Sequence, residues 1–426
     1  MHTDSEMLLL GAGASVEAGV PAAILMTKRM LEHFETADFM GADRYSRALA
    51  FVVGGLMFGE ARKGNNPYAT GINVEAVFNA VDLLAKRNTL EAAPFIGSWD
   101  ANVELLDQID PSDRDADFFL RELMLQVQTQ IMPAVRDSVS GRYGMPTSHA
   151  VPVSLHDSFI EAVNRAPRPG NGNLFEGIKR RMLAALTEMV LLERGTDLSY
   201  LKPLFEQPKP LVIASLNYDN AIEEAADQNG WQWTDFLDDW NEKGKISTDF
   251  LNANTVHLIK LHGSILWQRS VSGVKNSKSV FSTTEFVRRQ PDGQDPYSHT
   301  RYSPGVIFGG VNKLTPEGPY LDLLRAFSDH LSHAQRLTVV GYSFCDFHIN
   351  VQIVRWLERN PNSIMRIIDP HFSRIRHDFA DQLRFFSQQT ARVQVMEIPK
   401  GLSDAEYDKQ IKTFTGDRLR ELFSPA

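Results

Sequence analysis

The chain has only one cysteine, Cys345, among its 426 residues. A single cysteine forms no intrachain disulfide and cannot supply a four-cysteine zinc site, so a metal would need histidine and carboxylate ligands. The sequence also lacks any apolar run of the ~18 residues that a membrane-spanning helix needs. The residues before its first short apolar run are acidic, which is not typical of a signal peptide. We therefore expect a cytoplasmic protein that does not enter the membrane.

An excess of positive charge is also missing. The chain has 44 lysines and arginines and 53 aspartates and glutamates, which gives a net charge of −9. Such a chain has no overall electrostatic attraction for nucleic acid, so we expect no direct nucleic-acid binding. Repeats and low-complexity segments are absent from the sequence as well. Its 43% apolar and 23% charged residues are typical of a soluble globular protein, and its length of 426 residues predicts two or three domains.

The most informative stretch lies near the start of the chain. Four apolar residues, Met7–Leu10, predict a short buried strand, and the small residues Gly11–Ser15 predict a tight turn before a helix. A strand–turn–helix of this kind presents backbone N–H groups and a positive helix end to an anion such as a dinucleotide pyrophosphate. Val16 stands where the third glycine of Gly-x-Gly-x-x-Gly would be. A packing turn in another doubly wound sheet is therefore the alternative.

The rest of the chain divides by periodicity. Residues 22–207 carry apolar residues at helical spacing, for instance at 74–84, 118–132, 158–164 and 178–192, and predict a helical insertion domain. From residue 208 strands and helices alternate, which predicts a Rossmann-like α/β domain formed by residues 1–21 and 208–426, with a parallel sheet covered on both faces. The expected strands are residues 7–11, 210–216, 255–261, 306–308, 337–340, 365–368 and 393–396. Residues 268–303, rich in Ser, Gly, Arg and Gln, are expected to form an exposed or mobile excursion.

Polar residues directly follow five of these strands. Ligands of open α/β sheets bind outside the carboxyl ends of the strands, so we expect the five turns to meet at one site. The turns are Gly11–Ser15, Ser215–Asp219, Leu261–Ser264, Gly341–Phe344 and Asp369-Pro370.

Each turn also has a purely local interpretation. Asn217 and Asp219 would cap a helix, and His262 would be a hydrogen-bonded histidine at a strand end. Asp346 would be the N-cap of the helix after the fourth turn, and Asp369 would open a turn.

The order of these motifs resembles that of the sirtuin superfamily, and is most similar to its bacterial branch of antiphage-defence effectors. The resemblance covers residues 7–21 and roughly 210–400, and the helical block matches only by position, as the variable insertion of the family. The matching motifs are Gly11-Ala12-Gly13-Ala14-Ser15 with Gly19-Val20-Pro21, Leu216-Asn217-Tyr218-Asp219, Lys260-Leu261-His262-Gly263-Ser264 and Gly341-Tyr342-Ser343.

The resemblance implies an NAD⁺ site at these motifs. Asn217 would lie beside the nicotinamide ribose with Asp219 near it, and His262 would be the general base; these three are the expected catalytic residues. The first turn would hold the pyrophosphate. Gly341, Tyr342 and Ser343 would contact the phosphates or the adenosine ribose, and Asp369 would contact the adenosine side. The expected NAD⁺-binding residues are Gly11, Ala12, Gly13, Ser15, Pro21, Asn217, Gly263, Ser264, Gly341, Tyr342, Ser343 and Asp369. Neither zinc nor another metal is expected.

Two departures from the deacetylating sirtuins change the expected reaction. Those enzymes carry a four-cysteine zinc ribbon after the His-Gly motif, and they have Asp-Phe-Arg where this chain has Ala22-Ala23-Ile24. Because this chain lacks these elements, the binding surface for an acyl-lysine substrate is missing. We therefore expect water to be the acceptor of the ADP-ribosyl group. The sequence therefore predicts an NAD⁺ hydrolase that depletes cellular NAD⁺ as an antiphage-defence effector.

A constitutive NAD⁺ hydrolase would drain its own cell, so we expect gated activity. By analogy with defence effectors, the gate would be homo-oligomerisation or a partner such as a HerA-type ATPase or a short Argonaute. The short sequence after residue 400 favours a separate partner. The alternatives are a non-catalytic module that senses NAD⁺ or ADP-ribose, and an NAD-dependent protein deacylase or ADP-ribosyltransferase.

Overall fold

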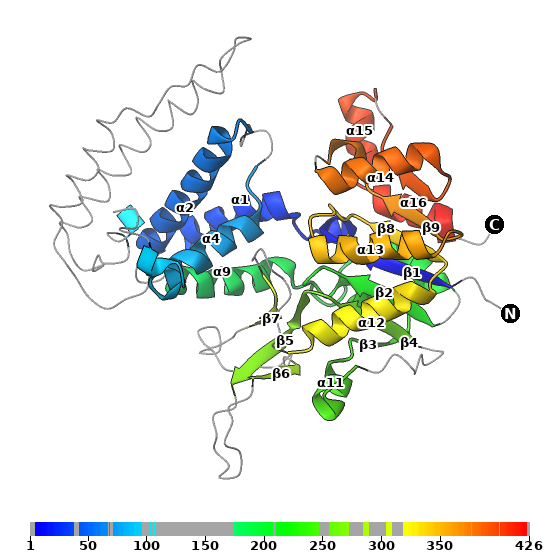
Figure 1. Cartoon of the computed structure of the whole chain (residues 1–426), viewed down its shortest axis with the longest axis horizontal. Coiled ribbons are helices and arrows are strands. Elements are labelled where there is room, and N and C mark those ends of the chain that lie inside the picture. Colours follow the sequence, from blue (N-terminus) through cyan, green and yellow to red (C-terminus); the bar gives the residue numbers. More distant parts are fainter. Residues whose placement is uncertain are drawn as a thin grey trace. The chain divides into compact units, whose positions relative to one another are not determined.

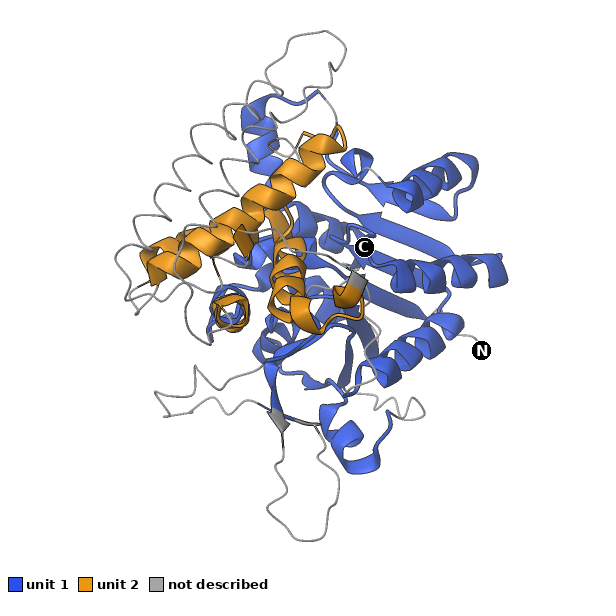
Figure 2. Cartoon of the chain, turned by 60° about the vertical axis from the view of Figure 1, so that its left-hand side comes forward, with its two compact units in different colours: residues 1–22, 186–426 blue, residues 23–185 orange. Residues whose placement is uncertain are grey.

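The computed structural model describes residues 5–37, 42–66, 68, 71–95, 102, 103, 106, 174–207, 210–246, 255–271, 284–288, 304–308, 318–375, 377–399 and 401–423. The chain forms two compact units, one of residues 1–22 and 186–426 and the other of residues 23–185 (Figure 2). The helices expected at residues 118–132 and 158–164 lie outside the described residues.

A seven-stranded sheet forms the centre of the first unit, with the strand order β10-β9-β8-β1-β2-β4-β3 (Figure 1). All of its pairings are parallel. The α/β Rossmann-like fold expected from the sequence is therefore confirmed. The strands are β1 (Glu6–Leu10), β2 (Leu211–Ser215), β3 (Gln232–Thr234), β4 (Thr255–Lys260), β8 (Arg336–Val340), β9 (Ile364–Ile368) and β10 (Val393–Met396).

Alternate residues of the central strand β1 enter two different cores. Met7 and Leu9 pack in a core with helices α12 (Tyr320–His333), α13 (Phe347–Arg359) and α14 (Asp378–Gln389). Leu8 and Leu10 pack in the other core, which includes α10 (Ala221–Gln228), α16 (Phe414–Phe423) and the 3-10 helix η5 (Ser199–Glu206). All four side chains are at most 2% exposed. The continuous apolar run at 7–10 is thus explained by a strand that is covered on both faces.

A second, antiparallel sheet of order β6-β5-β7 follows β4 in the chain. Its strands are β5 (Gly263–Val271), β6 (Thr284–Arg288) and β7 (Pro304–Val306). Two expectations were therefore wrong: the strand placed at 306–308 ends at Val306 and is antiparallel, and residues 268–303 are not all an exposed excursion. Phe286 is fully buried and packs in the core beside Trp267, because alternate residues of β5 and β6 face inward.

The described part of the second unit is helical, as expected for an insertion domain. Its helices are α1 (Ala23–Thr36), α2 (Ala42–Arg62), α4 (Val74–Lys86) and the first residues of α9 (Leu174–Val190). Helix α1 packs on α2 and α4, with Met30 and Phe34 only 1% exposed. The side chain of Asn73 caps α4 by accepting the N–H of Glu75 at 2.8 Å. No described helix is long and apolar enough to cross a membrane.

Candidate functional site

The turn after β1 is a 3-10 helix, η1 (Ala12–Ala18). It ends at Gly19, whose φ of 89° lies in the left-handed region that glycine adopts without strain. The α-helix expected after this turn starts only at Ala23. Pro21 is buried just before that helix. The predicted strand–turn–helix is thus present, with a longer turn than its sequence indicated.

Glycines allow the turns after β1 and β8 to meet backbone to backbone. The N–H of Gly11 donates to the carbonyl oxygen of Val340, and the N–H of Gly13 donates to that of Gly341, each at 2.9 Å. A Cβ atom on Gly341, where φ is +59°, would lie 2.4 Å from the backbone nitrogen of Ala14. These glycines therefore serve the contact between two turns. The N–H groups of Gly11 and Gly13 are used within the protein, so pyrophosphate contacts in this turn would fall to other residues, such as Ala12 and Ser15.

The side chain of Asn217 connects the turn after β2 to the turn after β1. Its Nδ2 atom donates to the carbonyl oxygen of Gly11 at 2.9 Å and to Oγ of Ser15 at 3.0 Å. The residue is only 8% exposed. Because a carboxamide nitrogen has two hydrogens, both are used by the turn, and a substrate contact would fall to Oδ1. Three of the predicted site residues are thus brought together.

Asp219 lies in the same turn, but its carboxylate serves the start of α10. Its Oδ1 accepts the N–H of Ala221 at 3.0 Å, and the residue is 5% exposed. The N-cap of α10 is Asn220, whose side chain makes no capping hydrogen bond. The local interpretation of Asp219 as the helix cap was therefore wrong, and its carboxylate instead closes a short turn just before the helix. The backbone carbonyl of Asp219 accepts a hydrogen bond from Nζ of Lys260, the last residue of β4.

His262 lies where the two sheets join, between β4 and β5. Its ring is buried, at 2% exposure, and lies 6.3 Å from the ring of Tyr218 and 6.0 Å from that of His348. Its Nε2 atom lies 3.7 Å from Oδ1 of Asp346. Residues that follow β2, β4 and β8 therefore meet around one imidazole.

Asp346 and His348 are functional candidates that the sequence did not reveal. Asp346 was predicted only as an N-cap; it occupies that position before α13, but its side chain makes no capping hydrogen bond. No spacing rule connects residue 346 to residue 262. The one available signal was the position of both residues just after strands of the same parallel sheet, where side chains converge.

Gly263 and Ser264 have clear structural roles in β5. Gly263 has a φ of +82°, and a Cβ atom there would lie 2.0 Å from the carbonyl oxygen of Gly305. Ser264 is fully buried, and its Oγ accepts the N–H of Leu266 at 3.1 Å. The pairing of β5 with β7 therefore requires a glycine after His262. Contacts of either residue with NAD⁺ stay predictions.

The phenol of Tyr342 is built into the turn after β8. It donates to Oδ1 of Asn350 at 3.1 Å and accepts the N–H of Asp346 at 3.1 Å. The ring is 3% exposed. The carbonyl oxygen of the next residue, Ser343, lies 2.6 Å from Nε2 of His377. Tyr342 thus shapes the loop that carries Asp346, and its predicted contact with substrate stays a prediction.

Asp369 follows β9 at the same edge of the sheet. Its Oδ1 accepts the N–H of His371 at 2.7 Å. Burial raises the pKa of this carboxyl to about 6, with a smaller contribution from the negative charge of Glu397. The turn adjoins the one after β8, since the N–H of Gly341 donates to the carbonyl oxygen of Ile368 at 2.8 Å.

Two further residues, Tyr200 and Glu17, fasten the turn after β1 to other parts of the first unit by hydrogen bonds. The hydroxyl of Tyr200, in η5, donates to the carbonyl oxygen of Ala14 at 2.8 Å. The carboxylate of Glu17 accepts the N–H groups of Thr415 and Gly416 at the start of α16. Both contacts join segments that are far apart in sequence, and neither residue belongs to a recognisable motif. They fix the position of η1 relative to the sheet.

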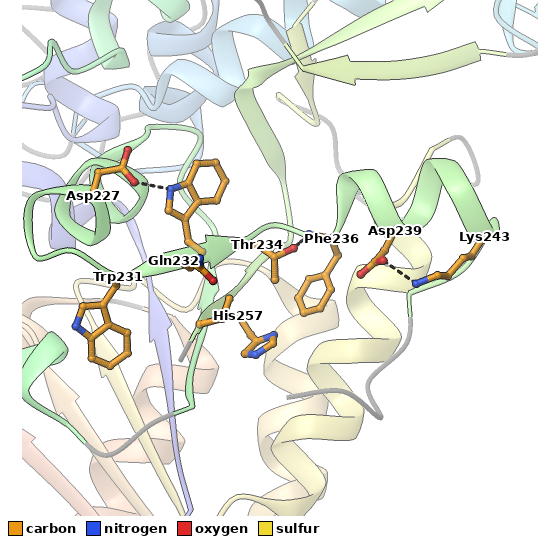
Figure 3. A pocket seen from close by; sticks show the side chains of 10 residues that line it. Asp227, Trp231, Gln232, Thr234, Phe236, Asp239, Lys243 and His257 are labelled. Carbon is orange, nitrogen blue, oxygen red and sulfur yellow. Dashed lines mark hydrogen bonds and ion pairs between the residues drawn. The ribbon is translucent and has the colours of Figure 1, made fainter. Parts of the chain in front are cut away.

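A cavity of about 620 Å³ lies elsewhere in the first unit, along β3 and the beginning of β4 (Figure 3). The ring of His257 stacks on that of Phe236 there, with centroids 5.8 Å apart. None of the predicted site residues lines this cavity. Its lining residues are Asp227, Trp231, Gln232, Trp233, Thr234, Phe236, Asp239, Lys243, Thr255 and His257.

Metal-ligating side chains do not cluster in the part of the chain that the structure describes: no three or more His, Cys, Asp or Glu residues there are placed to hold an ion. The comparison with family models matches residues 211–393 to the SIR2-like domain. The matched segment contains β2, β4, β8 and β9 with the turns that follow them, whereas β1 and η1 lie outside it. No curated protein matches the chain.

Proposed function

Since this chain is a sirtuin-like protein whose SIR2-like domain fits NAD-related chemistry, we propose that it hydrolyses NAD⁺ to nicotinamide and ADP-ribose. The observation that carries the proposal is the meeting of three turns around His262, with Asp346 3.7 Å from its Nε2 atom. The Asn217 carboxamide stands in one of these turns and is tied to η1. An imidazole, a carboxylate and an amide oxygen at one sheet edge are suited to positioning a water molecule and taking its proton.

The reaction needs one bond to break and one to form. The bond between C1′ of the ribose and the nicotinamide nitrogen breaks, its electron pair leaves with neutral nicotinamide, and C1′ becomes oxocarbenium-like. The oxygen of a water molecule then bonds to C1′ and loses a proton. We assign that proton to His262, because an ordinary imidazole has a pKa of about 6.5 and accepts protons near neutral pH.

The neighbours of His262 support this role. The Asp346 carboxylate would stabilise the imidazolium that forms when the ring takes the proton. The Oδ1 atom of Asn217 would accept a hydrogen bond from the water or from a ribose hydroxyl, because Nδ2 is occupied by Gly11 and Ser15. Asp219 would act by shaping the turn after β2, because its carboxylate accepts a hydrogen bond from the N–H of Ala221.

We further propose that the activity is an antiphage-defence function gated by assembly, either of this chain with itself or with a separate protein. The experiment measures nicotinamide release from NAD⁺ by the chain alone, across protein concentrations, and with the product of the neighbouring gene. Release that appears only on assembly supports gating. Strong release from a dilute monomer contradicts gating but not hydrolysis.

A non-catalytic module that senses NAD⁺ or ADP-ribose is the second candidate. It is favoured by the structural use of groups that the catalytic proposal needs, since the amide nitrogen of Asn217 and the carboxylate of Asp219 are already hydrogen-bonded within the fold. Calorimetric NAD⁺ binding without any nicotinamide release, under every assembly condition, would favour the sensor over the hydrolase.

A further inference from the structure

The carboxyl end of β4 holds a buried ion pair that the proposed reaction does not use. Nζ of Lys260 lies 3.4 Å from Oε1 of Glu223 in α10, and the two side chains are 2% and 3% exposed. The same Nζ donates to the backbone carbonyl oxygen of Asp219. One ammonium group thus joins a strand end, a helix and a turn.

Stability alone is a weak explanation for such a pair. Removing two charges from water is costly, and apolar residues of similar volume often replace a buried ion pair with no loss of stability. An ion pair instead constrains geometry. The ammonium of Lys260 must lie within reach of both Oε1 of Glu223 and the carbonyl oxygen of Asp219. A buried ion pair therefore fixes the relative positions of the segments that carry its members.

Those segments carry the two groups assigned to the reaction. Asn217 lies two residues before Asp219, and His262 lies two residues after Lys260. A backbone hydrogen bond from the N–H of Ile265 to the carbonyl oxygen of Tyr218, at 3.0 Å, adds a second link between the same turns. The hydrogen bond from Lys260 to Asp219 therefore joins the turn that carries Asn217 to the turn that carries His262.

We propose that Lys260, held by Glu223, is a positioning residue that sets the distance between the Asn217 carboxamide and the His262 imidazole. The inference rests on the proposed hydrolysis of NAD⁺. Lys260 does not touch the substrate in this scheme, and it acts only through the turn at 217–219. Its loss should therefore reduce the rate of the chemical step more than the affinity for NAD⁺.

The surroundings of Glu223 make the charge of the ion pair, and so its contribution to the reaction rate, depend on pH. Burial raises the pKa of Glu223 to about 7, with Lys260 opposing the shift and the charges of Asp219 and Asp235 adding to it. Asp235 is held by the guanidinium of Arg288 and by Nε1 of Trp267, at 2.9 and 2.7 Å. The pair is thus fully charged only above neutral pH, and its contribution to the rate should grow as pH rises through this range.

The test compares the single variants Lys260→Arg, Lys260→Met and Glu223→Gln with a double variant. The double variant combines Lys260→Met with Glu223→Gln and leaves no uncompensated buried charge. Each is measured for nicotinamide release, NAD⁺ affinity by calorimetry and melting temperature. Lys243→Met, which removes the partner of Asp239 on the exposed surface of α11 (Leu237–Lys243), is the control. For the double variant we expect kcat to fall about 10- to 100-fold, with the dissociation constant of NAD⁺ changed less than about threefold.

Partial rescue by Lys260→Arg, and a flatter rate profile between about pH 6 and 8 in Glu223→Gln, would support a positioning role. If the wild type is active and the folded double variant keeps the wild-type kcat, the inference is overturned but the proposed function is not. A wild type that releases no nicotinamide in any assembly state overturns the proposed function, and the inference with it.

Discussion

The Nε2 atom of His262 lies 3.7 Å from Oδ1 of Asp346. His262 follows β4 and Asp346 follows β8, and β1 and β2 stand between these strands in the sheet. The two side chains reach each other because parallel strands end at one edge, where the residues that follow them converge. This relationship, and the hydrogen bonds of Asn217 to η1, define the site in which we place NAD⁺ hydrolysis.

Asp346→Asn tests the role of the carboxylate beside His262. The substitution keeps the shape of the side chain and removes its charge, so the imidazolium that forms during the reaction loses the negative charge 3.7 Å from its Nε2 atom. We expect nicotinamide release to slow about tenfold, which is less than the ~10²–10⁴-fold contributed by a general base itself. Asp378→Asn, at an exposed position at the start of α14, is the matched control. Equal rates for Asp346→Asn and the wild type would exclude the role of Asp346.

Asn217→Ala tests the link between the turns after β1 and β2. The substitution leaves two buried acceptors, the Gly11 carbonyl and Ser15 Oγ, without the amide donor, so we expect a loss of about 2 kcal/mol in the free energy of unfolding. Because η1 is then less fixed, NAD⁺ affinity should also fall. Urea unfolding and calorimetry measure the two effects. Unchanged affinity in a destabilised variant would limit Asn217 to a structural role.

Gly341→Ala tests the close approach of the turns. A Cβ atom there would lie 2.4 Å from backbone atoms of Gly13 and Ala14, and the φ of +59° adds strain for any other residue. Gly401→Ala is the control, because its φ is +87° and no atom lies within 4 Å of the added Cβ. We expect about 1–2 kcal/mol of destabilisation in the control from the backbone alone, and clearly more in Gly341→Ala. Similar urea midpoints for both variants would contradict the steric explanation.

Asp369→Asn tests the buried carboxyl after β9. Its pKa is raised to about 6 from 3.8 by burial, so its protonated form stabilises the fold below pH 3.8, and this contribution is lost as pH rises through about 6. Relative to Asp369→Asn, the wild type should therefore lose about 2 kcal/mol of unfolding free energy between about pH 4 and pH 7. Asp408→Asn, at an exposed position of α15 (Asp404–Ile411), is the control. Parallel stability curves for wild type and Asp369→Asn would show that the carboxyl is not perturbed.

Six strands of the parallel sheet were predictable because they carry strong local signals, whereas the three-residue edge strand β3 was not among the expected strands. Met7–Leu10, for example, is an unbroken apolar run in which every side chain is buried. Polar residues directly follow five of the expected strands, and this position at the carboxyl ends of parallel strands is why their turns were predicted to converge. The close contact of Asn217 with Gly11 and Ser15 is one result of that arrangement.

Other parts of the site depend on contacts that no local pattern encodes. The hydroxyl of Tyr200 reaches the carbonyl oxygen of Ala14, 186 residues earlier in the chain. The glycines at 11 and 13 were interpreted as space for an anion, yet they make room for Gly341. Phe286 belongs to the core although the next residue, Val287, is 40% exposed, because only alternate residues of a strand face inward.

The central claim is that His262 takes the proton from the water that attacks NAD⁺. The most direct measurement is nicotinamide release by wild type and by His262→Ala, with NAD⁺ affinity and melting temperature recorded for both. We predict that His262→Ala keeps the fold and most of its affinity for NAD⁺, and that it loses about 10²–10⁴-fold in rate. A folded His262→Ala protein that releases nicotinamide at most of the wild-type rate would contradict the claim.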